Sequence, residues 1–430
     1  MERSGIRRGD RWRRLAVDLT PLRRSRDFRL LWLGELVSEA GSQVALVAVF
    51  VQVFALTRSS AAVGAVGAVQ LVPLAIAALL GGPIIDRYDR RRLLLAAQCG
   101  QAAASGLLLV GALAGHPPLG LVYAGAALVA GCSGFSLSTR ASMTPNLVPA
   151  DQLPSALSLN QVGWNTCLIA GPALGGVLID QLGLAWAYGI DVASFGATIA
   201  ACLLMAPQWP APVEARPGSV LATGWAALVE GLRYLRGKRV LQTTFYVDLV
   251  AMIFGMPRAL FPVLAATRFG GGSETVGLLF SAVAAGALAG ALTSGWVRQV
   301  RRQGLAVLWA VVVWGLGIIA FGFAGDGLAL ALGCLAVAGA ADVVSAVFRG
   351  TILQRNVPDD LRGRITGVHT LVVVGGPRLG DLEAGVVAAA FTPTVAVVSG
   401  GIACIAGVGL LAATVPQFAR YRADAIPASG

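Results

Sequence analysis

The chain has 430 residues, of which 56% are hydrophobic and only 13% charged, and its formal net charge is +11. Ordinary soluble domains carry about a quarter charged residues, so this composition excludes a soluble globular protein. The positive charge would fit a nucleic-acid partner in a soluble protein, but here its distribution follows membrane topology and anionic lipid headgroups.

Apolar runs long enough to cross a bilayer recur along the whole chain. A helix of about 20 apolar residues spans a hydrocarbon core of about 30 Å, and these runs lack the two-residue alternation of barrel strands. The sequence therefore predicts an all-α membrane protein with twelve transmembrane helices, near residues 28–55, 60–85, 93–114, 118–142, 155–181, 184–206, 240–266, 274–298, 304–324, 327–352, 364–388 and 391–415.

Basic residues lie almost entirely on one side of the predicted spans. Of the 33 Lys and Arg residues, 29 fall on that side, counting Arg140 at the end of span 4; only Arg58 and Arg268 fall on the other. The positive-inside rule makes the basic side cytoplasmic. We therefore expect a multi-pass protein of the bacterial cytoplasmic (inner) membrane with both termini in the cytoplasm.

The chain divides into two similar halves. "ELVSEAG" at Glu35 matches "DLVAMIFG" at Asp248, "RASMTPNLVPADQL" from Arg140 matches "RGTILQRNVPDDL" from Arg349, and "GPALGG" matches "GPRLGD" at Gly376. Parallel repeats of this kind build transporters whose substrate site lies between the halves. The predicted segments are a basic arm at 1–27, six-helix pseudo-symmetric halves at 28–206 and 240–415, a linker with an amphipathic helix at 207–239, and a tail at 416–430.

The loop "GGPIIDRYDRRRLLL" after span 2 resembles the loop signature of the major facilitator superfamily. Asp89 stands where the family usually has glycine. The resemblance implies a cytoplasmic gate whose basic residues bridge the two halves when that face is closed. The matching positions are Gly82, Asp86, Arg87, Arg90 and Arg91.

Other segments point to export. "GPALGG", with Gly171, Pro172, Gly175 and Gly176, resembles the fifth-helix motif of antiporters in that superfamily. "MPRALFPVLA", "GLLFSAVAAGALAGALTSG" and "LQRNVPDDLRGRITGV" are similar to the branch that contains exporters of enterobactin-type siderophores and related drug pumps. The resemblance implies a proton-coupled exporter that works by alternating access. The fourth-helix arginine of many antiporters has no counterpart midway along span 4.

Four carboxylates inside predicted spans are candidates for proton coupling, because intramembrane ionisable groups are costly and usually functional. Glu35 and Glu39 lie one helical turn apart, and like charges that close disfavour ionisation of both. A buried structural pair satisfied by Arg or Ser is the alternative. Asp248 is the repeat equivalent of Glu35, and Asp381 lies in span 11.

A second group of residues is predicted to line the substrate cavity. Arg258 could pair with Asp248 or face an anionic or catecholate substrate, whereas Arg378 and Asp381, three residues apart, could form a local ion pair. Asp342 shares a helix face with Ser345 and Arg349, and Arg349 is expected to act as a gate or a lipid-facing anchor. Trp164 and Asn165 either line the cavity or pack in the bundle.

Several other functions receive less support. A multidrug pump of the same superfamily is the main alternative; a membrane sensor or scaffold would be expected to lose the intramembrane carboxylates. An intramembrane enzyme would need a metal-binding carboxylate cluster, and GxxxxGK[ST] for ATP is absent. The six cysteines form no CxxC pair, which favours buried hydrophobes over metal ligands. We expect no enzyme activity, cofactor, metal or nucleic acid, and a monomer whose partners are the lipid bilayer, a small molecule and protons, acting alone or with an outer-membrane or cell-envelope export system.

Overall fold

The computed structural model describes residues 18–210 and 220–422. The predicted basic arm and C-terminal tail therefore lie partly outside the described residues. The predicted all-helical architecture is confirmed. The first half contains α2 (Thr20–Arg24), α3 (Arg26–Thr57), α4 (Ser60–Ile85), α5 (Arg90–Leu113), α6 (Leu119–Leu147), η1 (Ala150–Gln152), α7 (Leu153–Leu182) and α8 (Leu184–Leu204).

The linker and the second half follow in the same manner. They comprise α9 (Val220–Leu235), α10 (Arg239–Phe254), η2 (Arg258–Leu260), α11 (Phe261–Thr267), α12 (Ser273–Leu292), η3 (Ser294–Gln299), α13 (Gln303–Gly322), α14 (Leu328–Asn356), α15 (Asp359–Ala390), α16 (Pro393–Thr414) and α17 (Pro416–Ala419).

Helix ends are set by local chemistry. The Ser25 and Ser59 hydroxyls accept hydrogen bonds from the backbone N–H groups of Phe28 and Ala62, which caps α3 and α4. Gly183, with φ of 89°, makes the turn from α7 into α8. A backbone conformation of this kind favours glycine, because other residues meet a steric penalty there.

Within the described residues, eleven segments are long and apolar enough to cross a membrane. The remaining predicted span, 364–388, lies within α15, which is 32 residues long. α15 is less apolar because its sequence includes Arg364, Arg378, Asp381 and Glu383.

The seventh predicted span, 240–266, is a broken helix. α10 ends at Phe254, and the chain passes through Gly255 and Pro257 before the short helices η2 and α11. Proline disfavours a helical conformation in the residue before it and lacks a backbone N–H, so the helical ladder stops here. The Trp314 indole N–H donates to the Gly255 carbonyl oxygen at 2.8 Å, which satisfies a polar group that the break exposes.

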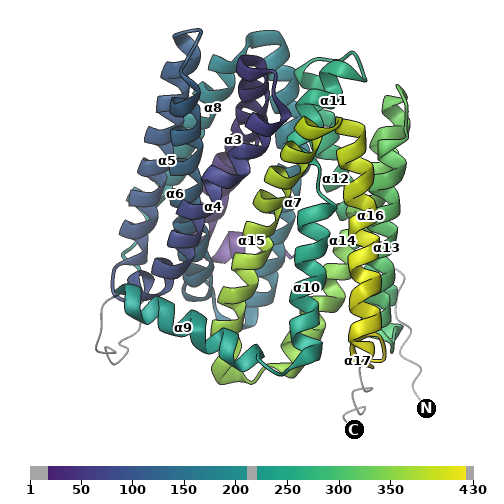
Figure 1. Ribbon diagram of the computed structural model, residues 1–430. Coiled ribbons are helices and arrows are strands. Elements are labelled where there is room, and N and C mark those ends of the chain that lie inside the picture. The colour runs from purple at the N-terminus through teal and green to yellow at the C-terminus, as the bar shows by residue number, and fades with distance from the viewer. Residues whose placement is uncertain (1–17, 211–219, 423–430) are drawn as a thin grey trace, which may run out of the picture.

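The helices run roughly side by side between two ends of the bundle (Figure 1). We call the end that carries α9 and α17 the linker end, and the opposite end, which carries the turns at Arg58 and Phe391, the far end. The described chain begins and ends at the linker end, where Ser25 hydrogen-bonds to Leu147 and Asn356 to Tyr421.

Near the far end, α4 of the first half packs directly on α15 of the second. A Cβ atom on Gly64 would lie 2.5 Å from the Asp381 carbonyl oxygen and 2.9 Å from the Gly385 Cα atom. Small residues allow such backbone approach between membrane helices. We call this contact the α4–α15 seam.

A second seam joins α7 to α12. A Cβ on Gly176 would lie 2.9 Å from the Glu274 Cα atom, and one on Gly277 would lie 3.1 Å from the Gly176 Cα atom. The Ser281 hydroxyl donates to the Ile169 carbonyl oxygen at 2.6 Å across the same pair of helices. The two halves are thus held together by two seams, both rich in glycine.

At the linker end, α9 bridges the halves (Figure 1). Gly224 lies against the Leu79 backbone of α4, and Gly231 lies against the Arg364 backbone of α15. Glu230 also forms an ion pair with Arg364. The described part of the linker contains the helix α9, which packs on α4 of the first half and on α15 of the second, and its Tyr234 hydroxyl donates to the Asn356 carbonyl oxygen of α14 at 3.1 Å.

Candidate functional site

A half-buried ion pair joins two helices of the first half. Glu35 of α3 pairs with Arg140 of α6. The Gln98 amide nitrogen of α5 lies 3.4 Å from a Glu35 oxygen and 3.1 Å from the Ser136 hydroxyl. Arg140 therefore belongs to a polar network between helices, although the sequence placed it at the end of span 4. It is a fourth-helix arginine that the sequence analysis did not recognise.

The second half holds an equivalent pair. An Arg349 nitrogen lies 2.7 Å from an Asp248 oxygen and 4.0 Å from an Asp342 oxygen. Arg349 also donates to the Ser345 hydroxyl at 3.1 Å. The expectation of a lipid-facing anchor is wrong, because only 4% of Arg349 is exposed. This side chain avoids the lipid by pairing with a carboxylate inside the bundle.

The third buried pair connects the broken span to α15. Arg258 in η2 donates to Asp381 at 2.8 Å. Arg258 therefore does not pair with Asp248, whose partner is Arg349. The predicted local pair of Arg378 with Asp381 is also wrong as a direct contact, since Arg378 donates instead to the Val374 carbonyl oxygen at 2.7 Å. Arg258 of the neighbouring η2 is therefore the ion-pair partner of Asp381.

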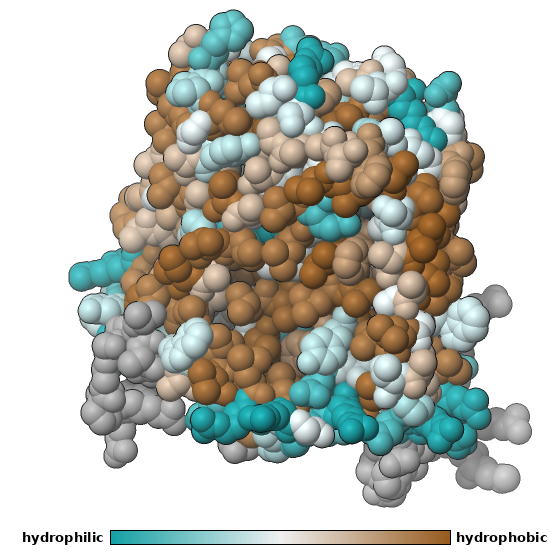
Figure 2. Space-filling view, in the orientation of Figure 1, coloured by the Kyte–Doolittle hydropathy of each residue, from teal (hydrophilic) through white to brown (hydrophobic). Residues whose placement is uncertain are grey.

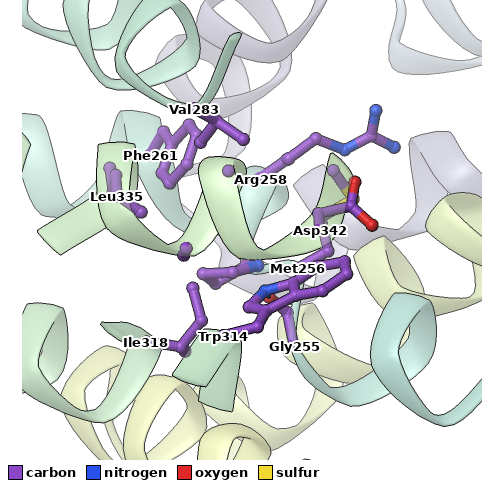
Figure 3. Close-up of a pocket in the computed structure, with 12 residues that line it drawn as sticks. Gly255, Met256, Arg258, Phe261, Val283, Trp314, Ile318, Leu335 and Asp342 are labelled. Atoms are coloured by element: carbon purple, nitrogen blue, oxygen red, sulfur yellow. The ribbon is translucent and has the colours of Figure 1, made fainter. Parts of the chain in front are cut away.

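A small pocket lies beside this pair, inside the second half (Figure 3). The polar ends of Arg258 and Asp342 lie at one side of it, whereas Phe261, Val283 and Leu335 lie at the other. The remaining lining residues are Gly255, Met256, Pro257, Trp314, Ile318, Ala338 and Gly339. The break in the seventh span therefore brings an arginine to the edge of an apolar pocket.

A second pocket lies between the two halves, on the linker side of the α4–α15 seam. Leu371 and Val374 line it, and Arg378 follows them on the same face of α15, at i, i+3 and i+7. Figure 2 shows the surface hollowed and largely apolar above the hydrophilic band of the linker end. The other lining residues are Leu74 and Ala78 of α4, Gly134, Leu137 and Ser138 of α6, and Thr370 of α15.

Glu39 and Asp191 form a further polar site in the first half. Glu39 accepts a hydrogen bond from the Gln43 amide at 2.7 Å. Asp191 of α8 is completely buried and accepts from the hydroxyls of Ser105 at 2.6 Å and Ser42 at 3.3 Å. The sequence analysis missed Asp191, although an aspartate within the apolar run of span 6 was a visible signal.

The two aromatic and amide candidates lie on α7. Asn165 accepts a hydrogen bond from Gln161 at 3.2 Å. Ile169, Pro172 and Gly176 contact α12, and Asn165 lies on the same face of α7, one helical turn before Ile169. Asn165 therefore lies on the side of α7 that faces the other half. Trp164 is 38% exposed. The roles of Trp164 and Asn165 in lining a substrate cavity stay predictions.

The fifth-helix motif serves two interfaces. Gly171 lies against Gln43, and Gly175 lies against Val44, so both pack on α3 within the first half. Pro172 and Gly176 contact α12 of the second half. This one segment therefore fixes α7 to its own half and forms the α7–α12 seam.

The loop signature after α4 organises the linker end of the first half. Arg90 donates to the Ser142 carbonyl oxygen at 2.9 Å and Arg91 to that of Met205 at 2.8 Å. Asp89, only 2% exposed, caps α5 and accepts from the Gln208 backbone N–H at 2.8 Å. Asp89, at the position where the family usually has glycine, is thus a helix cap that also contacts the start of the linker at Gln208, whereas the Arg90 and Arg91 contacts lie within the first half.

The remaining signature residues lie around the same turn. Asp86 ends α4 and is exposed, as are Gly82 and Arg87. A Cβ on Gly82 would meet no other atom within 4 Å. The bridging of the two halves by this loop stays a prediction.

Comparison with known proteins places the chain in a family. The family model described as "Transmembrane secretion effector" matches residues 16–428. The chain is 30% identical to the enterobactin exporter EntS of Salmonella typhi over 413 residues, covering 94% of this chain and 96% of the relative. It is 29% identical to EntS of Shigella boydii over 412 residues, with the same coverage.

Solved structures share the fold. The nucleoside transporter NupG superposes with a TM-score of 0.74 at 12% identity, covering 90% of this chain and 99% of that one. A bacterial homologue of the lysosomal transporter Spinster, crystallised in an inward-facing and unoccupied conformation, gives a TM-score of 0.64 at 15% identity, covering 91% and 95%. The chain belongs to the transmembrane secretion effector family and is a multi-pass transporter of the major facilitator superfamily, not an enzyme.

Proposed function

We propose that this transporter exports a catecholate siderophore of the enterobactin type from the cytoplasm. The similarity to enterobactin exporters extends over nearly the full length of both chains. It thus includes both halves and the space between them, where transporters built from parallel repeats bind their substrates.

The charge balance beside the pocket between the halves carries the substrate assignment. Arg258 and Arg378 both lie near Asp381, and Arg258 forms the ion pair with it at 2.8 Å. Arg378 is left with a backbone carbonyl as its hydrogen-bond partner. An excess guanidinium in an apolar setting favours an anionic ligand, and its planar fork suits adjacent oxygens such as those of a catecholate.

Alternating access is supported by the difference between the two ends of the bundle. The α4–α15 and α7–α12 seams hold the halves together towards the far end, whereas the surface is hollowed towards the linker end. The basic residues make the linker end cytoplasmic. In this conformation the substrate would reach the site from the cytoplasm, and rocking of the halves would release it on the other side.

Proton antiport supplies the energy in this proposal, without a bound cofactor. It requires an intramembrane group that exchanges a proton as the halves rock. The transporter acts in the bacterial cytoplasmic membrane with both termini inside. It functions as a monomer and passes its substrate to the cell envelope.

A multidrug pump of the same superfamily is the second candidate. The lining of the pocket between the halves favours this function. Five of its side chains are aliphatic, namely Leu74, Ala78, Leu137, Leu371 and Val374. Such a surface suits a large apolar drug.

A deletion strain separates the two functions. We expect it to secrete less catecholate siderophore while its drug susceptibility stays unchanged. Unchanged secretion with lowered drug resistance would overturn the siderophore assignment. Complementation with Arg378→Gln should restore little secretion, whereas the matched control Arg233→Gln, at an exposed position of α9, should restore it fully.

A further inference from the structure

The carboxylates inside the bundle differ in the partners that they contact. Glu35, Asp248 and Asp381 each contact an arginine directly, and Asp342 has Arg349 at 4.0 Å. For Glu39 and Asp191, by contrast, the polar contacts of the described structure come from neutral groups. A carboxylate next to a guanidinium stays ionised, whereas a buried one without a cation is strongly disfavoured in its charged form.

Asp191 is the more deeply placed of the two. No part of it is exposed, and its two oxygens accept from Ser105 of α5 and Ser42 of α3. α8 approaches α3 closely at Gly41, which has no side chain. A Cβ atom at this position would lie 3.2 Å from the Asp191 Cα atom. The aspartate therefore sits where three helices meet, with hydroxyl groups as its partners.

Glu39 lies beside it on α3 and keeps part of its surface exposed. Its partner Gln43 is the residue after Ser42, which donates to Asp191. Ser42 and Gln43 are adjacent on α3, so the side chains that they contact, Asp191 and Glu39, occupy neighbouring positions. Glu39 is thus the accessible member of the pair and Asp191 the enclosed one.

Among the residues that the structure describes, no ion pair joins Glu39 or Asp191 to a basic side chain. α5 contributes neutral groups here, namely Gln98, Gln101 and Ser105. Arg140 of α6 is paired with Glu35, which lies one helical turn before Glu39 on α3. The other titratable neighbours are Cys167 of α7 and Tyr188 of α8, and the latter donates to Gln52 at 2.7 Å.

We propose that Glu39 and Asp191 together hold the proton that is exchanged for substrate, with Asp191 as the storage site and Glu39 as the group that exchanges with water. The inference rests on the proposed proton antiport. When the Asp191 O–H bond breaks, the proton passes to Glu39 and then to water, and the Ser105 and Ser42 hydroxyls stabilise the carboxylate that remains. The arginine-paired carboxylates, Glu35, Asp248 and Asp381, take no part in this exchange.

Infrared spectroscopy tests the site without any substrate. The full chain, reconstituted in lipid vesicles, is titrated with acid while the C=O absorption of protonated carboxyl groups is recorded in H2O and D2O. We expect a D2O-sensitive band in the wild type that is absent in Asp191→Asn. The matched control Asp326→Asn, at an exposed turn, should retain it. A band that survives in both Asp191→Asn and Glu39→Gln would overturn the assignment.

Two further variants guard against misfolding. Asp191→Glu should keep a protonated carboxyl band, and Ser105→Ala should shift its frequency, because it removes the 2.6 Å hydrogen bond. If sodium chloride at constant pH abolished the wild-type band, the site would bind sodium and the proton assignment would fall.

A transport assay distinguishes this inference from the proposed function. With enterobactin as the probe, Asp191→Asn should lose accumulation driven by a pH gradient but keep downhill exchange. Loss of enterobactin transport in the wild type would refute the proposed function, while leaving the infrared result for the carboxyl pair intact. Gradient-driven accumulation by Asp191→Asn equal to that of the wild type would refute the inference alone.

Discussion

Arg349 of α14 lies 2.7 Å from Asp248 of α10, and Arg140 of α6 contacts Glu35 of α3 in the same way. The four residues occupy matching positions in the two sequence repeats. The duplication has therefore preserved one ion pair in each half, between the first and fourth spans of that half.

Breaking one of these pairs should destabilise its half strongly. Arg349→Leu leaves Asp248 buried without a cation, a change that typically costs about 3–5 kcal/mol of unfolding free energy. The double variant Asp248→Asn/Arg349→Gln removes both charges and should recover part of the loss. Thermal unfolding in detergent measures both. Equal melting temperatures for the wild type and Arg349→Leu would contradict the structural role.

The α4–α15 seam should not tolerate a side chain at Gly64. Gly64→Ala places a Cβ 2.9 Å from the Gly385 Cα atom, so the halves must move apart towards the far end. Spin labels at Ser59 and Thr392 should report a longer mean distance across the far end. Gly106→Ala is the matched control, because a Cβ there meets nothing within 4 Å. A distance distribution that is unchanged in Gly64→Ala would show that the seam is not tightly packed.

The break in the seventh span depends on one indole. Trp314→Phe removes the 2.8 Å hydrogen bond to Gly255 and leaves that carbonyl without its donor. The expected cost is about 1–3 kcal/mol for an unsatisfied buried group. Trp309→Phe serves as the control, because Trp309 is 61% exposed. Similar melting temperatures for the two variants would argue against a specific role for the hydrogen bond.

The cap of α5 provides a fourth test. Asp89→Ala removes an N-cap, which typically costs about 0.5–2 kcal/mol, and also releases the Gln208 backbone N–H. Asp86→Ala, in the same loop but exposed, should change stability little. The comparison is made by chemical unfolding in detergent, and the prediction fails if Asp86→Ala is the more destabilised variant.

Patterns that repeat in the sequence predicted the architecture well. Apolar runs placed the spans, and the matched segments at Glu35 and Asp248 anticipated two equivalent sites. The helical wheel of the segment that contains Arg378 and Asp381 was less informative. It placed Arg378 near Asp381, but it carried no information about Arg258, which reaches the aspartate from a different helix at 2.8 Å.

Two other features escaped prediction for physical reasons. Arg140 lies near the boundary of an apolar run, where a topological anchor and a buried partner look alike without the position of Glu35. Asp191 belongs to no motif or repeat, and its importance emerges only from its burial and the neutral hydroxyls around it. Sequence periodicity identifies which residues lie inside a membrane, whereas partner choice depends on how helices are arranged.

The position of α9 would limit the rocking of the halves that we propose. Because Gly224 lies on α4 and Glu230 pairs with Arg364 of α15, widening the linker end must slide α9 off one of these helices or stretch the connections on either side of it. The linker is therefore a mechanical stop as well as a connection. In the rocking motion that we propose, the contacts of α9 with α4, α14 and α15 would set how wide the linker end can open.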